Sequence, residues 1–232
     1  PIIFEDDNFL VIDKPAELIV HRTKISTDTI SVVQILKEQL KVDYIHPVHR
    51  LDRATSGAML MSKNKEATVF ATEQFMSQKV DKTHFTIIRG WPKEDEGVVD
   101  KSLKNAKGVQ QDALTEYKVI HKVELPVQLG KSPTTRYSLL RCKPKTGRQN
   151  QIRRHVKHLT GPIIGDTNFG KKEHNDYFKN EFNAGNLLLF SAQLKLELYP
   201  DKQFIFKVEI PEVFQKLCTQ FNWSQDLISE NY

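Results

Sequence analysis

A single carboxylate, Asp52, lies between Arg50 and Arg53 in residues 49–57, just before a turn-forming Thr-Ser-Gly. Nearby positive charge favours the ionised form of a carboxyl group. A charged carboxylate held in a tight turn can act as a nucleophile, although an aspartate beside arginine is more often half of a structural ion pair. Asp52 is therefore a candidate nucleophile whose role depends on what the rest of the chain offers.

A second candidate site is the basic run at residues 145–155, in which Gly147 supplies a turn before a helical pattern. Side chains three or four positions apart lie on one face of a helix. This rule predicts two faces: Gln149, Arg153 and Lys157 on one, Arg154 and His158 on the other. One of these arginines could pair with Asp52 and others with phosphates. A basic surface helix is the alternative.

Two pairs of histidines, His46 with His49 and His155 with His158, have the i, i+3 spacing of some zinc ligands. His46 precedes Pro47, which disfavours a helix there, and His155 lies among cations, which disfavour binding another cation. We therefore expect no metal.

The composition is that of a globular protein: 232 residues, 39% hydrophobic, 27% charged, with a net charge of +5. No apolar run approaches the roughly 20 residues that span a membrane, and the first residues lack the features of a signal peptide. The only cysteines, Cys142 and Cys218, are too few for a disulfide framework. We expect a cytoplasmic chain.

Positive charge is concentrated in one part of the chain. Residues 141–172 contain nine basic residues and a single acid, Asp166, whereas residues 173–232 contain five lysines and nine acids. Such separation predicts a face for an anionic polymer, with a solvated basic surface as the alternative. Phosphate contacts of this kind give affinity but little choice of sequence.

The apolar pattern predicts strands and helices without a regular β-α-β alternation. Strands are expected at residues 9–15, 58–61, 83–89, 115–123, 135–142, 187–190, 194–198 and 204–210. Helices are expected at 31–40, 65–78, 149–159 and 211–221, and the polar segment 93–111 is expected to be a mobile loop or a surface hairpin. These elements favour an α+β fold on a mostly antiparallel mixed sheet.

Five ordered segments resemble the signature motifs of the RluA family of RNA pseudouridine synthases. Residues 49–57 match HRLDxxTSG, the most specific of them. The others are residues 14–21, similar to KPxGxxVH; 82–90, similar to KxYxAxVxG; 146–153, similar to TGRxHQxR; and 162–166, similar to PIxGD. Within the family, Arg89-Gly90-Trp91, an insertion in residues 125–137, and residues 153–155 running into the PIxGD-like segment most resemble the TruC-type tRNA pseudouridine-65 synthases.

The resemblance implies the pseudouridine synthase fold: one domain over residues 1–232, with two lobes around a central RNA-binding cleft and no separate N-terminal RNA-binding domain. It implies an isomerase without cofactor or metal. Such an enzyme breaks the bond from uridine N1 to ribose C1′, rotates the base and joins C5 to C1′. Asp52 matches the family's catalytic aspartate, which attacks either C1′ or C6, and Arg153 matches the arginine that pairs with it.

The resemblance implies that the protein binds RNA, with tRNA as the expected substrate and rRNA as the alternative. We expect a monomer that does not contact membranes. The target base must leave its stack to reach Asp52, which costs a few kcal/mol. We expect phosphates to be held by basic residues of the two motifs, namely Arg50, Arg53, Arg148, Arg154 and Lys157.

The chain departs from the family pattern at His84, which replaces a tyrosine that stacks on the flipped base and is implicated in a proton transfer. Histidine is aromatic and moves protons near neutral pH, so we expect His84 to be catalytic. Alternatively Phe85 or Tyr44 supplies the stacking, or the protein is a catalytically weakened RNA-binding homologue. Asn150 replaces a histidine and is expected to alter a supporting hydrogen bond; Glu17 replaces a glycine.

Overall fold

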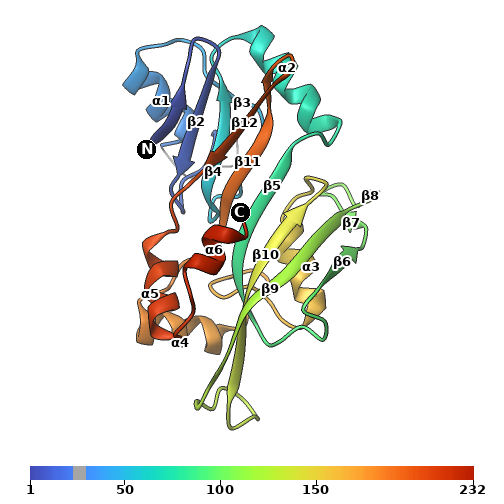
Figure 1. Ribbon diagram of the computed structural model, residues 1–232, viewed down its shortest axis with the longest axis vertical. Helices are drawn as coiled ribbons and strands as arrows, with labels where there is room; N and C mark the ends of the chain where they lie inside the picture. The colour runs from blue at the N-terminus through green and yellow to red at the C-terminus, as the bar shows by residue number, and fades with distance from the viewer. Residues whose placement is uncertain (23–29) are drawn as a thin grey trace. The chain divides into compact units, whose positions relative to one another are not determined.

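The computed structural model describes residues 1–22 and 30–232, and the chain divides into two compact units (Figure 1). Unit 1 comprises Pro1–Lys82 and Ser191–Val208; unit 2 comprises Thr83–Phe190 and Glu209–Tyr232. Their strands and interspersed helices confirm the α+β class. That the units are the lobes of one cleft in a single domain stays a prediction. Among the described residues, no helix is both long and apolar enough to cross a membrane.

Unit 1 is built on a sheet with the strand order β1-β2-β4-β11, in which β3 also pairs with β4 and β12 with β11. β2 and β4 are almost entirely buried, which explains why both read as continuous apolar runs. The bounds are β1 (Ile2–Glu5), β2 (Phe9–Lys14), β3 (His46–Pro47), β4 (Ser56–Ser62), β11 (Leu189–Tyr199) and β12 (Lys202–Lys207).

Two helices belong to unit 1, α1 (Val32–Leu40) and α2 (Lys65–Met76), and both begin at a capping side chain. Ser31 accepts a hydrogen bond from the first turn of α1, and Asn64 does the same for α2. The core of the unit joins β2, α1 and β4. Leu51 belongs to this core, so the residue before Asp52 is anchored in the interior.

Unit 2 is built on antiparallel strands in the order β5-β10-β9-β6, beside a separate two-stranded hairpin, β7-β8. The strands are β5 (Asp81–Arg89), whose first two residues belong to unit 1, β6 (Glu96–Asp100), β7 (Leu103–Lys104), β8 (Gln110–Gln111), β9 (Leu114–Leu125) and β10 (Thr135–Pro144). The helices are α3 (Gln151–Leu159), α4 (Lys172–Phe182), α5 (Glu212–Gln220) and α6 (Asp226–Glu230). Figure 1 shows β9 and β10 as one long hairpin.

Most predicted elements are present, and the exceptions have physical causes. Residues 187–210 form two strands instead of the three predicted. The predicted strands 187–190 and 194–198 are joined in β11, because Ser191 and Gln193 are buried within that strand and do not interrupt it. Segment 93–111 contains the expected hairpin, but it also contains β6, which pairs with β9. The mostly polar helix α4 is not predicted from the sequence at all.

Candidate functional site

Asp52 lies in unit 1 on the loop between β3 and β4, and this loop is fixed on both sides of it. The Thr55 backbone N–H donates to the Asp52 carbonyl oxygen at 3.0 Å and closes a turn. On the other side, His49 Nε2 accepts from the Leu60 backbone N–H at 3.0 Å, and its ring stacks on Phe75 with centroids 4.5 Å apart. The half-buried side chain of Asp52 therefore extends from a backbone that is held in place on both sides.

Gly57, the second residue of β4, follows the same loop at a point where the backbone of β11 passes close by. Its φ is +111°, and a Cβ at this position would lie 2.1 Å from the Ser191 carbonyl oxygen. Only glycine tolerates both the conformation and the approach. The glycine of the HRLDxxTSG-like stretch is thus required by the packing of unit 1.

Lys14, the buried last residue of β2, contacts the Asp52 loop. The sequence does not reveal this role, although Lys14 begins the KPxGxxVH-like segment. Its ammonium donates to three backbone carbonyl oxygens: Pro15 at 2.7 Å, Leu18 at 2.8 Å and Arg53 at 3.1 Å. The Arg53 bond ties the loop to the segment after β2. Burial lowers the pKa of Lys14 to about 8, while the charges of Glu17, Asp52 and Asp13 oppose that shift.

Arg50 and Arg53 flank Asp52 in sequence, and both are exposed at the surface of unit 1. Arg53 Nε lies 3.5 Å from the Glu17 carboxylate, in an exposed ion pair that contributes little stability. Glu17 has a φ of +62°, in the left-handed region that favours glycine. This conformation is consistent with the glycine of the family pattern, and this chain adopts it with a side chain present.

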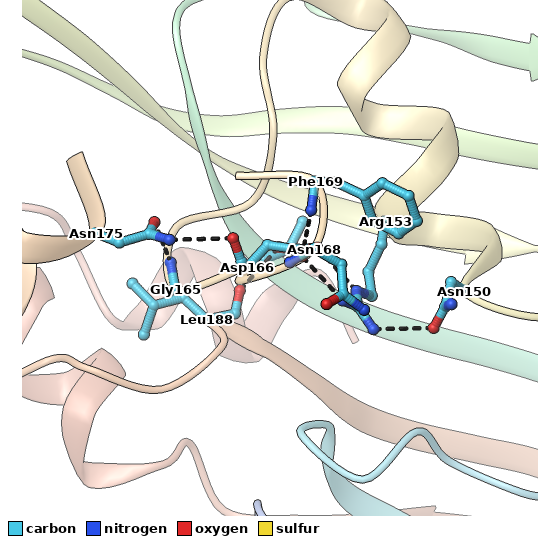
Figure 2. A network of polar contacts seen from close by, with 9 residues as sticks. Asn150, Arg153, Gly165, Asp166, Asn168, Phe169, Asn175 and Leu188 are labelled. Carbon is cyan, nitrogen blue, oxygen red and sulfur yellow. Dashed lines mark hydrogen bonds and ion pairs between the residues drawn. The ribbon is translucent and has the colours of Figure 1, made fainter. Parts of the chain in front are cut away.

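Arg153 lies on α3 in unit 2 and is held by a buried two-point ion pair with Asp166 (Figure 2). Its Nε donates to Asp166 Oδ2 and its Nη2 to Asp166 Oδ1, each at 2.8 Å. The side chain of Arg153 is 8% exposed and that of Asp166 is fully buried. A planar guanidinium bound at two points has a defined orientation, so Asp166 orients Arg153 within unit 2.

Asp166 is also fastened by the loop that follows it. Oδ1 accepts from the backbone N–H groups of Asn168 and Phe169, each at 2.9 Å. Asn175 of α4 donates to the Asp166 carbonyl oxygen and accepts from Gly165 N–H. Burial alone would raise the pKa of Asp166, but the hydrogen bonds from Arg153 and from these backbone N–H groups hold it below its ordinary value. Asp166 is thus an ionised, fully engaged carboxylate.

Asn150, where the family pattern has histidine, contacts the same guanidinium. Its Oδ1 accepts from Arg153 Nη1 at 2.9 Å (Figure 2). Asn150 has a φ of +52°, a conformation that asparagine tolerates better than most residues. α3 therefore begins at Gln151 and not at the predicted residue 149, and Gln149 does not share a helix face with Arg153.

Gln151 and His155 anchor α3 to β9, and neither role is evident from the sequence. Gln151 Nε2 donates to Thr115 Oγ1 at 2.9 Å, and its Oε1 accepts from Thr146 and from the Arg148 backbone N–H. His155 is buried, with Nδ1 2.9 Å from Thr115 Oγ1 and Nε2 2.9 Å from the Lys101 carbonyl oxygen. Burial lowers the pKa of His155. These bonds set the position of the helix that carries Arg153.

The predicted phosphate-binding residues of unit 2 lie around α3. Arg154 Nη1 donates to the Lys104 carbonyl oxygen at 3.0 Å, and Arg148 Nε donates to the Asp112 carbonyl oxygen at 2.9 Å. Lys157 is exposed. The half-buried ring of Phe169 lies under two cations, 5.3 Å from the Arg153 guanidinium and 5.7 Å from the Lys157 ammonium.

His84 lies on β5 in unit 2, opposite Cys142 of β10, and is 7% exposed. Its neighbour Phe85 is fully buried and packs on Phe190, with centroids 5.7 Å apart. Because successive strand residues face opposite sides, Phe85 belongs to the core and is excluded as a stacking residue. Tyr44 lies in unit 1, half-buried, with its hydroxyl 2.9 Å from Thr68 Oγ1.

The histidines of the zinc hypothesis do not gather into a ligand set. His49 Nε2 and both ring nitrogens of His155 are engaged in the bonds given above. His46 belongs to the short strand β3, as its position before Pro47 suggests. Within residues 1–22 and 30–232, no three His, Cys, Asp or Glu side chains are grouped so as to hold a metal ion.

The structure therefore assembles two sets of predicted residues. Asp52, Arg50 and Arg53 belong to unit 1, and His84, Arg148, Arg153, Arg154 and Lys157 belong to unit 2. The pairing of Asp52 with Arg153 stays a prediction.

The chain is similar to known proteins over most of its length. Residues 8–158 match the family described as RNA pseudouridylate synthase. The chain is 38% identical to a Vibrio parahaemolyticus protein named tRNA pseudouridine synthase C, over 98% of this chain and 97% of that protein. Proteins of the same name are 37% identical in Vibrio vulnificus, over 100% and 99%, and 37% identical in Haemophilus ducreyi, over 96% of each.

Two solved structures share the fold. Human RNA pseudouridylate synthase domain containing 4 has a TM-score of 0.73 at 24% identity, covering 95% of this chain and 92% of its own. Human RNA pseudouridylate synthase domain containing 1 has a TM-score of 0.72 at 20% identity, covering 99% and 92%. At these identities the likeness concerns the fold alone.

Proposed function

The chain belongs to the RNA pseudouridylate synthase family, and from this premise we propose that it isomerises a uridine of tRNA to pseudouridine. The motif-based prediction of the family is thereby confirmed. The observation that carries the choice of tRNA is similarity along nearly the whole chain to proteins named tRNA pseudouridine synthase C. Position 65 as the target, which the resemblance to the TruC type implies, is part of the proposal.

We propose Asp52 as the nucleophile. Attack of its carboxylate on ribose C1′ forms a C1′–O bond while the bond from C1′ to uracil N1 breaks; attack at C6 is the alternative. After the base has rotated, C5 bonds to C1′ and the carboxylate leaves. The fixed backbone on both sides of Asp52 supports this role, because a nucleophile held in one geometry needs little rearrangement to react.

The new C5–C1′ bond leaves a proton on C5 that must be removed, and N1, left anionic when its bond to C1′ broke, must gain one. We propose that His84 takes the proton from C5, since imidazole is a base near neutral pH, while N1 is protonated in its place. We propose Arg153 as the partner of the Asp52 carboxylate, as in the family pattern. Its attachment to Asp166 and Asn150 supports this role, because a guanidinium fixed at several points acts on a substrate or carboxylate without reorganising.

The test is release of tritium from unmodified tRNA transcripts that carry 5-tritiated uridine. Asp52→Ala should abolish release while leaving tRNA binding within a few-fold of wild type. Asp43→Ala is the matched control, because Asp43 is an exposed aspartate of the same unit outside the proposed site. Full release by Asp52→Ala would refute the proposed nucleophile.

A parallel assay with rRNA transcripts tests the choice of substrate. Product on tRNA alone supports the proposal, whereas product on rRNA alone would move the chain to the rRNA alternative. Tight binding of both RNAs by the wild type without any product would identify a catalytically weakened homologue.

A further inference from the structure

Five basic side chains of unit 2 form a continuous feature that the proposed chemistry does not use. Lys101 and Lys104 lie between β6 and the end of β7, and the other three lie on α3. Contacts join the two groups: Arg154 Nη1 donates to the Lys104 carbonyl oxygen at 3.0 Å, and Lys101 Nζ lies 3.5 Å from His158 Nδ1. We call this set the basic strip: Lys101, Lys104, Arg154, Lys157 and His158.

The cations of the strip lack paired negative charge, although Asp100 precedes Lys101 and Asp112 Oδ1 accepts from Ser102 Oγ at 3.1 Å. Within the described parts of the chain, none of its cations has a carboxylate within ion-pair distance, whereas Lys122, Arg136 and Lys145 of the same unit are paired with Asp95, Glu124 and Glu116. Four of the five members are exposed, and Arg154 is half-buried. Cations gathered at a surface without counter-charges repel one another, and an anion binding among them relieves that repulsion.

His158 lies in a positively charged environment that lowers its pKa. Burial lowers its pKa, and Lys101, Lys157 and Arg154 lower it further; these cations come from both elements that face it. The acid beside Lys101, Asp100, acts on His155, which faces the interior. In the free protein, these surroundings therefore favour the neutral form of the His158 imidazole.

Lys157, at one end of the strip, is separated from Arg153 by the ring of Phe169. Phe169 places its ring against the Arg153 guanidinium at 5.3 Å and against the Lys157 ammonium at 5.7 Å. Any polyanion that follows the strip toward Lys157 therefore reaches the residue proposed to act beside the nucleophile. The bonds of His155 and Gln151 hold α3 in place, so this spacing belongs to the folded unit.

We infer that the basic strip is a track for the phosphates of the substrate RNA next to the target uridine, and that His158 takes up a proton when a phosphate contacts both it and Lys101. The inference rests on the proposed function for the identity of the polymer. The cations supply affinity without reading bases. A phosphate that contacts both Lys101 and His158 offsets the repulsion between the ammonium and an imidazolium, and so favours the imidazolium form.

The first test measures binding of unmodified tRNA transcript by fluorescence anisotropy as a function of salt. Lys101→Ala should weaken binding about three- to tenfold at 0.1 M salt and reduce the slope of log K against log salt by about one unit. Lys179→Ala is the matched control, because it removes one exposed lysine of α4, outside the strip. Equal slopes for Lys101→Ala and wild type would overturn the inference.

The second test measures the same binding between pH 6 and pH 8.5. Wild-type affinity should rise as pH falls, by at most about tenfold per pH unit for one proton. His158→Gln should weaken binding and flatten this dependence. His158→Lys carries a permanent charge, so it should bind tightly at pH 8.5 with a similarly flat profile. A wild-type slope that persists in His158→Gln would overturn the proton uptake.

The two proposals can fail separately. A protein that modifies tRNA, but whose strip variants bind like wild type, overturns the track and leaves the proposed function intact. Weaker binding by strip variants of a protein that forms no pseudouridine supports the track and overturns the activity.

Discussion

Arg153 and Asp166, thirteen residues apart, form a buried ion pair in which two guanidinium nitrogens each lie 2.8 Å from a different carboxylate oxygen. The pair joins the TGRxHQxR-like segment to the PIxGD-like segment. Their resemblance to family motifs thus has a physical basis: one segment supplies the arginine and the other supplies the acid that orients it. The arginine is placed by its own unit before any substrate arrives.

Removing one partner of this pair should destabilise the protein strongly. Asp166→Asn leaves the Arg153 charge buried without its counter-ion, which costs about 3 kcal/mol or more. Denaturant unfolding measures the loss of unfolding free energy. Asp176→Asn is the control, because Asp176 forms an exposed pair with Lys172 and its replacement should change stability little. Similar effects of both substitutions would contradict the view that Arg153 depends on Asp166.

The stabilisation by Asp166 should also depend on pH. Its pKa in the folded protein lies below the ordinary 3.8, so its contribution is fully present above that value and is lost as pH falls through the folded pKa. The difference in unfolding free energy between wild type and Asp166→Asn should therefore be constant at neutral pH and shrink below about pH 4. A difference that grows on acidification would show that the carboxylate is not ionised in the folded state.

Local sequence signals predicted the elements well where apolar spacing is regular. α2 follows its stripe of Ala67 and Ala71, and β4 is a buried run between two turns. The apolar pattern predicts the wrong strand boundaries where polar side chains are buried: Ser191 and Gln193 are polar but lie inside β11. It also failed at α4, whose charged sequence has few apolar residues.

The sequence predicts which residues form the candidate site but not how they contact one another. Motif resemblance singles out Asp52, Arg153 and His84, whereas Asp166 stands out only as the lone acid of a basic segment and as the last residue of the PIxGD-like segment, with no partner assigned to it. The partner of a buried charge depends on segments that meet only in the folded chain, so spacing along the sequence does not reveal it. Lys14 shows the same limit, because its three acceptors are backbone carbonyls and carry no sequence signal.

Lys14 should act as a positioning residue for the Asp52 loop. Lys14→Met leaves the carbonyl oxygens of Pro15, Leu18 and Arg53 without this donor and removes a positive charge that acts on Asp52. We expect a loss of about 3 kcal/mol in stability. The acid limb of the profile of kcat against pH should move to higher pH, because the carboxylate loses a neighbouring cation.

A purely structural role for Lys14 would lower stability without moving the pH profile. Lys63→Met is the control for removing a lysine of unit 1, since Lys63 pairs with Glu5, away from the loop. It should leave the profile unchanged.

His84 can be tested for proton transfer separately from stacking. His84→Phe keeps an aromatic ring but has no group that accepts a proton. If His84 is the base, this variant should lose about 100-fold or more in single-turnover rate, and His84→Tyr should recover much of it, because tyrosine is the residue of the family pattern. A loss of less than about tenfold in His84→Phe would assign His84 to stacking alone.

Gly57, which directly follows the Asp52 loop at the start of β4, should not tolerate replacement. In Gly57→Ala the new methyl group would meet the Ser191 carbonyl oxygen at 2.1 Å on a backbone with φ +111°. The loop or β11 must shift, which should cost more than about 3 kcal/mol and lower tritium release by displacing Asp52. Gly108→Ala is the control that keeps the unfavourable backbone conformation but has no steric clash, because Gly108 has a φ of +79° with nothing within 4 Å of an added Cβ. That control should lose only about 1 kcal/mol and remain active. Equal losses of unfolding free energy in the two variants would show that the contact with β11 does not constrain the loop.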